Sequence, residues 1–362
     1  MTTAGSARSF ACDVCGATTE YAPGTDTLRC PHCAGEQAIA PAGRAVREHA
    51  WETLAKLPVK ATAAQRAPQA FRCPNCQAVT ETDALSERCH FCAAALVADP
   101  SRTERIVPEA VVPFALNKGA ARTALRTWTA TRWFAPSDLK RVTEAETTKG
   151  SYLPHWTYDA DTFSAYSGAR GEHYWVTESY TDSNGNSQTR RVRKTRWYPA
   201  SGSVPVSFDD VLVAGTTHLE EKQLDELQPW PLGDAKPYQD EYLAGFQTLR
   251  YDIEPEAGLE KAKGKMAETI RAECRRDIGG DEQRVDRVAT SYAELTFKLL
   301  LLPVWFLSYL HRGRTWQVMV NAHTGEVIGE RPYSVPKIVA ASLAAAVAVA
   351  AIVWLWFVVF RK

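Results

Sequence analysis

The sequence lacks the motifs on which several large classes of enzyme depend. It contains no phosphate-binding G-x-x-x-x-G-K-[ST] loop, no G-x-S-x-G turn, no H-E-x-x-H pair and no G-x-G-x-x-G nucleotide turn. The stretch nearest to a phosphate loop, residues 258–266, has five intervening residues and a methionine where magnesium binding requires a hydroxyl. We therefore expect no catalytic residues, no enzyme activity and no ATP-driven motor.

An export signal and a net charge are also missing. Residues 1–11 are polar and small, without the apolar stretch of a secretory signal peptide. The 42 Lys and Arg residues balance 42 Asp and Glu residues, so the formal net charge is zero and gives no global attraction to nucleic acid. We expect the large N-terminal part of the chain to stay on the cytoplasmic side, where thiols remain reduced.

Cysteine, in contrast, is concentrated at the start of the chain. Eight of the nine cysteines form four C-x-x-C pairs within the first hundred residues. One tight turn can present two thiolates at this spacing to a single ion, and two such turns complete a tetrahedral site that suits zinc. The spacing predicts two structural Zn2+ ions, one held by Cys12, Cys15, Cys30 and Cys33 and the other by Cys73, Cys76, Cys89 and Cys92.

Two alternatives bear on these cysteines. A disulfide framework would use the same residues, but the repeated metal-ligand spacing and the missing export signal argue against it. Nucleic-acid binding would need excess positive charge, whereas residues 1–100 carry nine basic and ten acidic side chains. Contact with protein partners is therefore the favoured role of the two zinc ribbons.

The other end of the chain is apolar. Residues 338–360 contain one polar side chain, Ser342, and as a helix they would span roughly 34 Å, which is enough to cross a bilayer. A buried core helix of this length would rarely be apolar on every side. The two sides of the run carry equal numbers of positive charges, so flanking charge does not indicate which side faces the cytoplasm. The cysteines indicate it instead, because metal binding requires the reduced thiols that the cytoplasm maintains. We expect a single-pass, tail-anchored protein of the cell membrane with its N-terminal domains in the cytoplasm.

These features give the following organisation and an α+β fold class. We expect a first zinc ribbon over 8–40, a helix and linker over 41–70, a second ribbon over 71–98, an α+β domain over 101–335 and a transmembrane helix over 338–360. Within the α+β domain the patterns predict a mainly antiparallel sheet and two main helices. The oligomeric state stays open.

Apolar periodicity places the helices. It predicts one helix over 44–57, ended by Pro58, and two longer helices over 118–134 and 255–277. Each longer helix stands between a short strand, at 106–116 or 246–253, and a strand with an L-P-x-W motif, at Leu153–Trp156 or Leu302–Trp305. This order suggests an internal duplication.

Two hairpins are expected in the same domain. One joins 171–181 to 188–199 around Asn184-Gly185, and the other joins 315–320 to 326–331. The first carries the densest basic cluster of the chain. We consider two roles for this cluster, contact with anionic lipid or nucleic acid, or a solvated arm facing Glu172 and Glu178. Its members are Arg190, Arg191, Arg193, Lys194 and Arg196.

Several stretches resemble a bacterial family of zinc-ribbon membrane proteins, which includes YdjG-like proteins. The stretches are 151–158, 164–174, 195–198, 207–213, 242–246, 277–285 and 320–334. Members are often labelled primosomal protein N′, superfamily II helicase or TFIIB-type zinc-ribbon protein. The resemblance implies a membrane adaptor that works beside SPFH-domain or phage-shock-type envelope proteins. It supplies no catalytic residues, and Phe297-Lys298-Leu299 stands here where the family has F-K-H.

Overall fold

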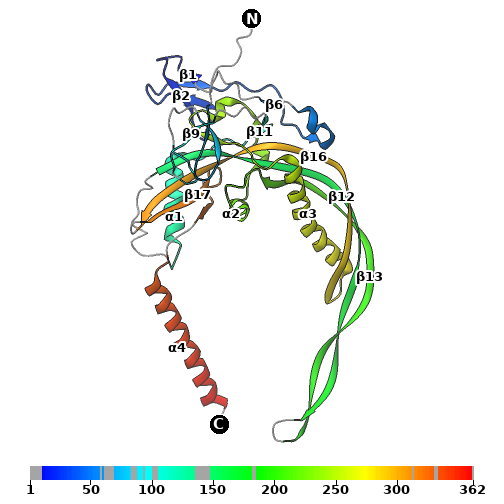
Figure 1. Cartoon of the computed structure of the whole chain (residues 1–362). Helices are drawn as coiled ribbons and strands as arrows, with labels where there is room; N and C mark the ends of the chain where they lie inside the picture. The colour runs from blue at the N-terminus through cyan, green and yellow to red at the C-terminus, as the bar shows by residue number, and fades with distance from the viewer. Residues whose placement is uncertain are drawn as a thin grey trace.

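The computed structural model shows a compact head with two long projections on the same side (Figure 1). One projection is helix α4 (Val335–Phe360), and the other is an arm made by β12 (Thr147–Thr181), β13 (Ser187–Ala214) and the first part of β16 (Glu282–His311). The structure describes residues 10–57, 59–60, 69–82, 88–92, 94–99, 105–134, 147–181, 185–311, 314–329 and 333–360.

The first cysteine segment forms a small sheet of its own. Its strands β1 (Phe10–Ala11), β2 (Thr18–Tyr21), β3 (Thr27–Arg29) and β4 (Glu36–Ala38) pair in chain order. They lie at the end of the head that is farthest from α4 and from the tip of the arm (Figure 1). Buried Tyr21 and Leu28 join the main hydrophobic core, so this ribbon is packed against the head.

The second cysteine segment is part of the central sheet. Its strands are β7 (Gln69–Arg72), β8 (Val79–Thr82) and β9 (Val97–Ala98). Strand β8 pairs with β15 (Gln247–Leu249), and β15 pairs in turn with β12. The second ribbon therefore extends a 12-stranded sheet.

Three long strands dominate that sheet. Strand β12 pairs antiparallel with β13 on one side and with β16 on the other. Strand β16 continues into β17 (Arg314–Asn321) and β18 (Val327–Gly329), which pair as the second predicted hairpin. Shorter strands complete the sheets: β5 (His49–Ala50), β6 (Val59–Lys60), β10 (Arg105–Ile106), β11 (Ala110–Val111) and β14 (Lys236–Pro237). The α+β fold class is confirmed.

Helix α3 (Pro255–Ile278) covers one face of the long strands. Its buried residues Leu259, Ala262, Met266, Ile270 and Cys274 recur every three or four positions, which puts them on one stripe against the sheet. The predicted helix over 255–277 is thus confirmed. Helix α1 (Lys118–Ala130) begins where predicted and ends four residues earlier, with Asn117 accepting the Ala120 N–H as its cap. A one-turn helix, α2 (Glu221–Glu226), lies after β13.

The strand pairing supports the internal duplication. The two L-P-x-W motifs pair antiparallel with each other, and Leu153 lies opposite Leu302. Strand β11 runs parallel to β16, with Ala110 opposite Leu300, while β15 runs parallel to β12, with Gln247 opposite Ser151. Each half thus places its short strand beside the long strand of the other half, as a local two-fold axis requires.

The tryptophans of the two motifs repeat the same contacts. Trp156 Nε1 donates to Ile253 O and Trp305 Nε1 donates to Leu116 O, both at 2.8 Å. Each acceptor lies two residues before the first residue of its helix. A second ring packs edge-on against each indole, Tyr251 at 5.2 Å and Phe114 at 4.9 Å between ring centroids. Equivalent residues therefore fix the start of α3 and the start of α1.

This equivalence makes a stability prediction. Replacing Trp156 or Trp305 by phenylalanine should lower the free energy of unfolding by roughly 1–3 kcal/mol in each case, because a buried carbonyl loses its donor. Thermal unfolding of the full chain in detergent, followed by near-UV circular dichroism, measures both variants. A lower free energy of unfolding in one variant and an unchanged one in the other would contradict the equivalence of the two tryptophans.

The predicted helix over 44–57 is wrong. Only Trp51–Lys56 is helical, as a short 3-10 helix, and β5 before it pairs with β16 opposite Thr296 and Phe297. Glu109 fixes the preceding residues, since it contacts Arg44 and accepts from the Arg47 N–H at 3.1 Å. Contacts made by residues far along the chain thus override the local helical pattern.

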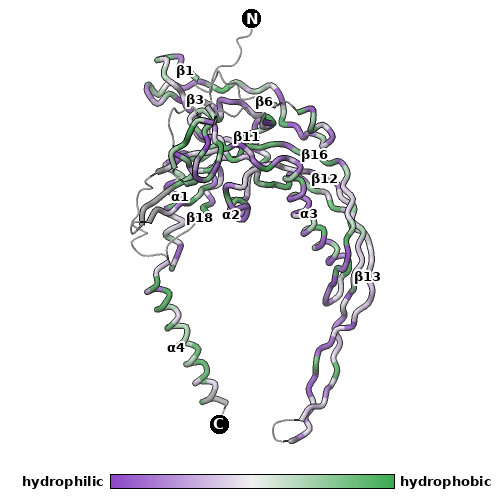
Figure 2. The backbone as a smooth tube through the Cα atoms, in the orientation of Figure 1, coloured by the Kyte–Doolittle hydropathy of each residue, from purple (hydrophilic) through white to green (hydrophobic). Residues whose placement is uncertain are grey.

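Three further predictions concern the strand at 106–116, the first hairpin and the apolar C-terminal run. The strand expected over 106–116 is two short strands, β10 and β11. The predicted hairpin is present as β12 and β13, with Thr181 opposite Ser187, but Asn184 of the expected turn lies outside the described residues. The apolar C-terminal run is helical, and it is hydrophobic along its length in Figure 2, where the arm alternates in hydropathy.

Candidate functional site

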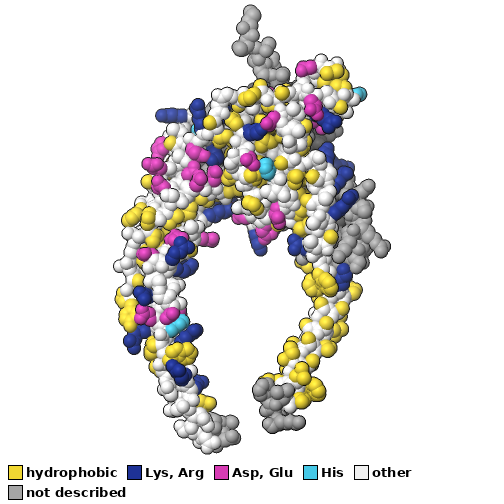
Figure 3. Space-filling model, turned by 180° about the vertical axis from the view of Figure 1, so that it is seen from behind, with side chains coloured by type: hydrophobic (Ala, Val, Ile, Leu, Met, Phe, Trp, Pro, Cys, Tyr) yellow, Lys and Arg dark blue, Asp and Glu magenta, His cyan; other side chains and the backbone are white. Residues whose placement is uncertain are grey.

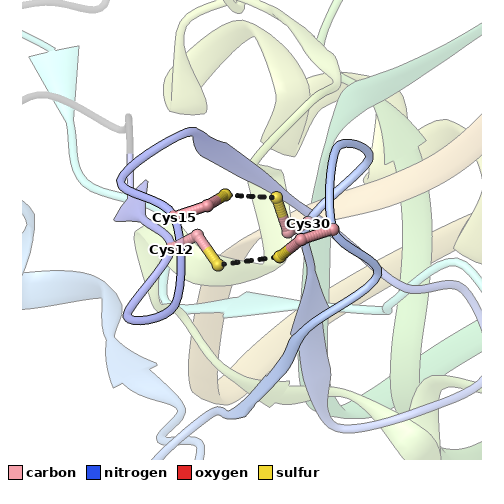
Figure 4. Close-up of side chains that lie close together, drawn as sticks. Cys12, Cys15 and Cys30 are labelled. Carbon is pink, nitrogen blue, oxygen red and sulfur yellow. Dashed lines mark hydrogen bonds between the residues drawn. The ribbon is translucent and has the colours of Figure 1, made fainter.

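The four cysteines of the first ribbon converge on one point. Cys12 Sγ lies 3.5 Å from Cys33 Sγ, and Cys15 Sγ lies 3.6 Å from Cys30 Sγ. Figure 4 shows the side chains of Cys12, Cys15 and Cys30 directed toward one another from two adjacent turns. A tetrahedron with zinc–sulfur bonds of about 2.3 Å has sulfur–sulfur edges of roughly 3.8 Å, so the sulfur positions suit a single metal ion.

The second ribbon repeats this arrangement. Cys73 Sγ lies 3.3 Å from Cys92 Sγ, and Cys76 Sγ lies 3.6 Å from Cys89 Sγ. In each ribbon the four sulfur atoms all lie within 4.8 Å of one another. Both predicted groups of four cysteines are therefore brought together, and each could hold a metal ion.

The turns that present the sulfurs share one backbone conformation. The residue after the second cysteine has positive φ in three of them, at Gly16 (73°), Ala34 (60°) and Gln77 (61°). Each of these residues donates its N–H to the carbonyl of the first cysteine of its pair. The fourth position, Ala93, lies outside the described residues. Gln77 occupies the position that Gly16 holds in the first ribbon, and it adopts the same conformation, so the turn is the same with glutamine as with glycine.

A prediction follows for this position. Ala34→Gly should make the first ribbon release its metal at a higher chelator concentration, because alanine at positive φ costs about 1–2 kcal/mol that glycine avoids. Gly16→Ala, at the equivalent place in the same ribbon, should shift the midpoint the other way. Competition with a chromogenic zinc chelator measures both. Shifts of the same sign in the two variants would contradict the argument.

Backbone N–H groups favour the thiolate form at one cysteine of each ribbon. The N–H of Cys33 lowers the pKa of Cys30 to about 6 against the opposing effect of burial, with help from the N–H of His32. Burial tends to raise the pKa of Cys92, yet the N–H of Ala94 and the side chain of Asn75 bring it down to about 7. Thiolate is the form that binds metal.

The two histidines inside these turns do not join the sulfur groups. His90 is buried, and neither of its ring nitrogens has a hydrogen-bond partner within the described structure. Burial lowers the pKa of His90 to about 3, so its ring is neutral and packs near Phe306. His32 is exposed, and neither of the two cysteine groups that could hold an ion includes a histidine.

Specific contacts fix both ribbons to the head. In the first, the Tyr21 N–H donates to Ala244 O at 3.0 Å and the Gly24 N–H donates to Phe114 O at 2.8 Å. In the second, Glu81 accepts from Arg250 at 2.8 Å, and Phe91 packs edge-on against Phe306. The metal groups are therefore built into the head.

The predicted basic cluster lies on the arm and divides between its two faces. Side chains alternate along β13, so Arg190, Lys194 and Arg196 lie on one face, and Arg191 and Arg193 on the other. Figure 3 shows basic and acidic side chains mixed along the arm, in contrast to the hydrophobic surface of α4. The cluster is therefore not one patch.

The head also contains a charged cluster that was not predicted from the sequence. The Lys298 ammonium is buried and contacts the carboxylates of Glu48 and Asp210. Beside it Asp159 accepts from the Asp210 N–H at 2.6 Å and from the Thr296 hydroxyl at 2.8 Å. Burial raises the pKa of Glu48 to about 7, with Lys298 opposing the rise. This cluster ties the segment between the ribbons to the sheet, and no spacing in the sequence links residues this far apart.

Helix α4 is long and apolar enough to cross a membrane. Its stretch Val335–Trp356 is the one candidate span in the described part of the chain, and none of it is buried against the head. A helix that is apolar on every side and packs on nothing needs another apolar environment.

Comparison with known proteins gives one distant similarity. The chain is 23% identical over 251 residues to a protein of Bacillus subtilis strain 168 named "Uncharacterized protein YdjG", a match that covers 68% of this chain and 70% of that protein. No family model matches the chain. No solved structure matches it either. The similarity agrees with the resemblance seen in the sequence, and the name of that protein states no activity.

Proposed function

We propose that the chain is a zinc-stabilised adaptor, anchored by α4 in the bacterial cell membrane, that binds protein partners at the cytoplasmic face. The observation that carries this proposal is the combination of two four-cysteine groups built into the head with an apolar helix that the head leaves uncovered. A closed shell of four sulfurs leaves no open position for substrate or water, so zinc here would stabilise a binding surface.

The two ends of the molecule would then have separate tasks. The first ribbon lies at the end of the head away from α4, so it would face the cytoplasm when α4 crosses the bilayer (Figure 1). Its exposed side chains would be available to a partner, while its buried ones pack on the head. The partners proposed from the family resemblance are membrane-organising proteins of the SPFH or phage-shock type.

Affinity capture tests the adaptor role. The tagged chain is purified from detergent-solubilised membranes after brief crosslinking in cells, beside a control with Cys12→Ser and Cys33→Ser. We expect membrane-organising proteins to be recovered with the intact chain and lost with the control, since the control disrupts the cytoplasmic ribbon. Recovery of replication or transcription proteins in both would contradict the proposal.

A nucleic-acid tether is the second candidate, and the arginines of the arm favour it. Arg191 and Arg193 have no carboxylate partner among the described residues, and Arg191 lies over the exposed ring of Trp175. Binding of this kind weakens steeply with salt. Fluorescence anisotropy with labelled DNA and RNA, from low to moderate salt, measures this dependence. The absence of binding at low salt would reject this candidate.

A further inference from the structure

The outer part of the arm is a two-stranded hairpin with two different faces. Strand β16 stops pairing with β12 at Gly171, and beyond this point only β12 and β13 pair, from Glu172 opposite Arg196 to Thr181 opposite Ser187. We call residues 172–181 and 187–196 the arm tip. It carries five basic and two acidic side chains, and no core covers either face.

One face offsets part of its charge, since it carries three basic and two acidic side chains. Glu178 lies 2.7 Å from the Lys194 ammonium and 3.6 Å from the Arg190 guanidinium. Arg196 lies over the ring of Tyr174, at 4.9 Å from its centroid. Lys194, with a smaller contribution from Arg190, lowers the pKa of Glu178. We call this the Glu178 face.

The opposite face keeps its positive charge. Arg191 stacks over Trp175 at 5.5 Å, and the indole is 58% exposed. Arg193 lies directly opposite Trp175 in the register. Neither guanidinium makes an ion pair with any carboxylate that the structure describes. Glu282, at the root of this side, is already bound by His173 at 2.8 Å and Thr195 at 3.0 Å. We call this the Trp175 face.

Hydroxyl side chains fill the remaining positions of the Trp175 face. Alternation in the paired strands places Thr177, Ser179 and Thr189 beside the two arginines. Guanidinium and hydroxyl groups are donors to phosphate oxygens, and an exposed tryptophan prefers the level of lipid headgroups. The Trp175 face thus has the chemistry of a surface that binds phosphate at a membrane interface.

We propose that the Trp175 face lies on the headgroups of anionic phospholipids, with the Glu178 face turned to the solvent. The proposal rests on the membrane anchoring by α4 proposed above. The arm and α4 project from the same side of the head, which brings the arm to the bilayer that α4 would enter (Figure 1). Figure 1 shows the arm running alongside α4, and the charges of the arm exclude it from hydrocarbon, so the arm and α4 must change their relative orientation for the arm to lie on the surface while α4 crosses.

Photocrosslinking in a bilayer tests the proposal at two neighbouring positions. The full chain is reconstituted into phosphatidylcholine vesicles with or without phosphatidylglycerol. The photoreactive residue p-benzoyl-phenylalanine replaces either Thr189, on the Trp175 face, or Gln188, on the Glu178 face. Lipid adducts are quantified by mass spectrometry. We expect roughly tenfold more phosphatidylglycerol adduct from position 189 than from position 188, and a fall to background in 0.5 M salt, on the order expected for two interfacial arginines.

Matched charge variants separate the two faces. Arg191→Gln with Arg193→Gln should abolish the adduct at position 189, whereas Arg190→Gln with Lys194→Gln should leave it within about twofold, because those two side chains lie on the opposite face and share the Glu178 carboxylate. Equal adducts at the two positions, or equal effects of the two double variants, would overturn the proposal. Crosslinking of position 189 to added DNA in preference to lipid would overturn it in favour of nucleic acid.

The anchor is checked separately in the same samples. Flotation of the vesicles shows whether the chain is inserted before any crosslink is measured. If the chain does not float with phosphatidylcholine, the proposed anchoring fails, and the crosslinks are then read with chain added to phosphatidylglycerol vesicles. The preference for position 189 over 188 decides the proposal in either case.

Discussion

Cys89→Ser should cost the protein one of two zinc ions and loosen one edge of its central sheet. Cys89 is buried, and its sulfur lies 3.6 Å from that of Cys76, so serine removes one of four ligands from the second group. Metal binding supplies roughly 10–16 kcal/mol to small zinc domains of this kind. A ribbon of about 30 residues cannot replace that from its own core.

Loss of the second metal site should also loosen the strand that pairs with the second ribbon. The second ribbon contributes β8, and Thr80 and Glu81 of β8 pair with β15. When β8 loosens, the amides of β15 and of residues 69–82 should exchange hydrogen at least about a hundredfold faster. Hydrogen exchange followed by mass spectrometry measures this, together with zinc content by elemental analysis.

Cys274→Ser is the matched control. Cys274 is equally buried, but it lies in α3 against the sheet, and burial raises the pKa of its thiol. It should keep two zinc ions per chain and normal exchange in β15. Retention of both ions by Cys89→Ser, or loss of an ion by Cys274→Ser, would contradict a zinc site at the second group of cysteines.

Removal of residues 338–360 should move the protein from the membrane fraction to the soluble fraction. None of the candidate span in α4 is buried against the head, so its loss exposes no core. Transfer of more than 20 apolar residues into lipid outweighs any contribution from the polar head. The truncated chain should keep its zinc and unfold within a few degrees of the detergent-solubilised full chain.

Fractionation with alkaline carbonate extraction measures the change. A full-length variant with Ala344→Ser is the control, since one added hydroxyl should not prevent insertion of so apolar a helix. Retention of the truncated chain in the membrane pellet would show that something other than α4 holds it there.

Features set by neighbouring residues could be predicted from the sequence. The C-x-x-C pairs define their turns locally, and the structure brings each predicted set of four sulfurs together. Helix α3 carries its apolar stripe at regular spacing, and the L-P-x-W repeat indicated the relation between the halves that the strand register supports.

Features set by distant partners could not be predicted. The segment 44–57 has a helical pattern, but Glu109 and β16 hold part of it extended. The buried ion pair of Lys298 with Glu48 joins residues 250 positions apart in the sequence. The division of the basic cluster follows from alternation along β13, but the partners of each basic side chain required the register of β12 with β13, which places Glu178 and Trp175.

The most direct test of the account is the metal content of the full chain extracted from membranes. Native mass spectrometry of the detergent-solubilised protein, with elemental analysis of the same sample, gives the number and identity of bound ions for the membrane-embedded form. We expect two zinc ions per chain, both released by chelator together with loss of near-UV circular dichroism. A membrane-extracted chain that is folded without zinc, or with disulfides between the paired cysteines, would contradict it.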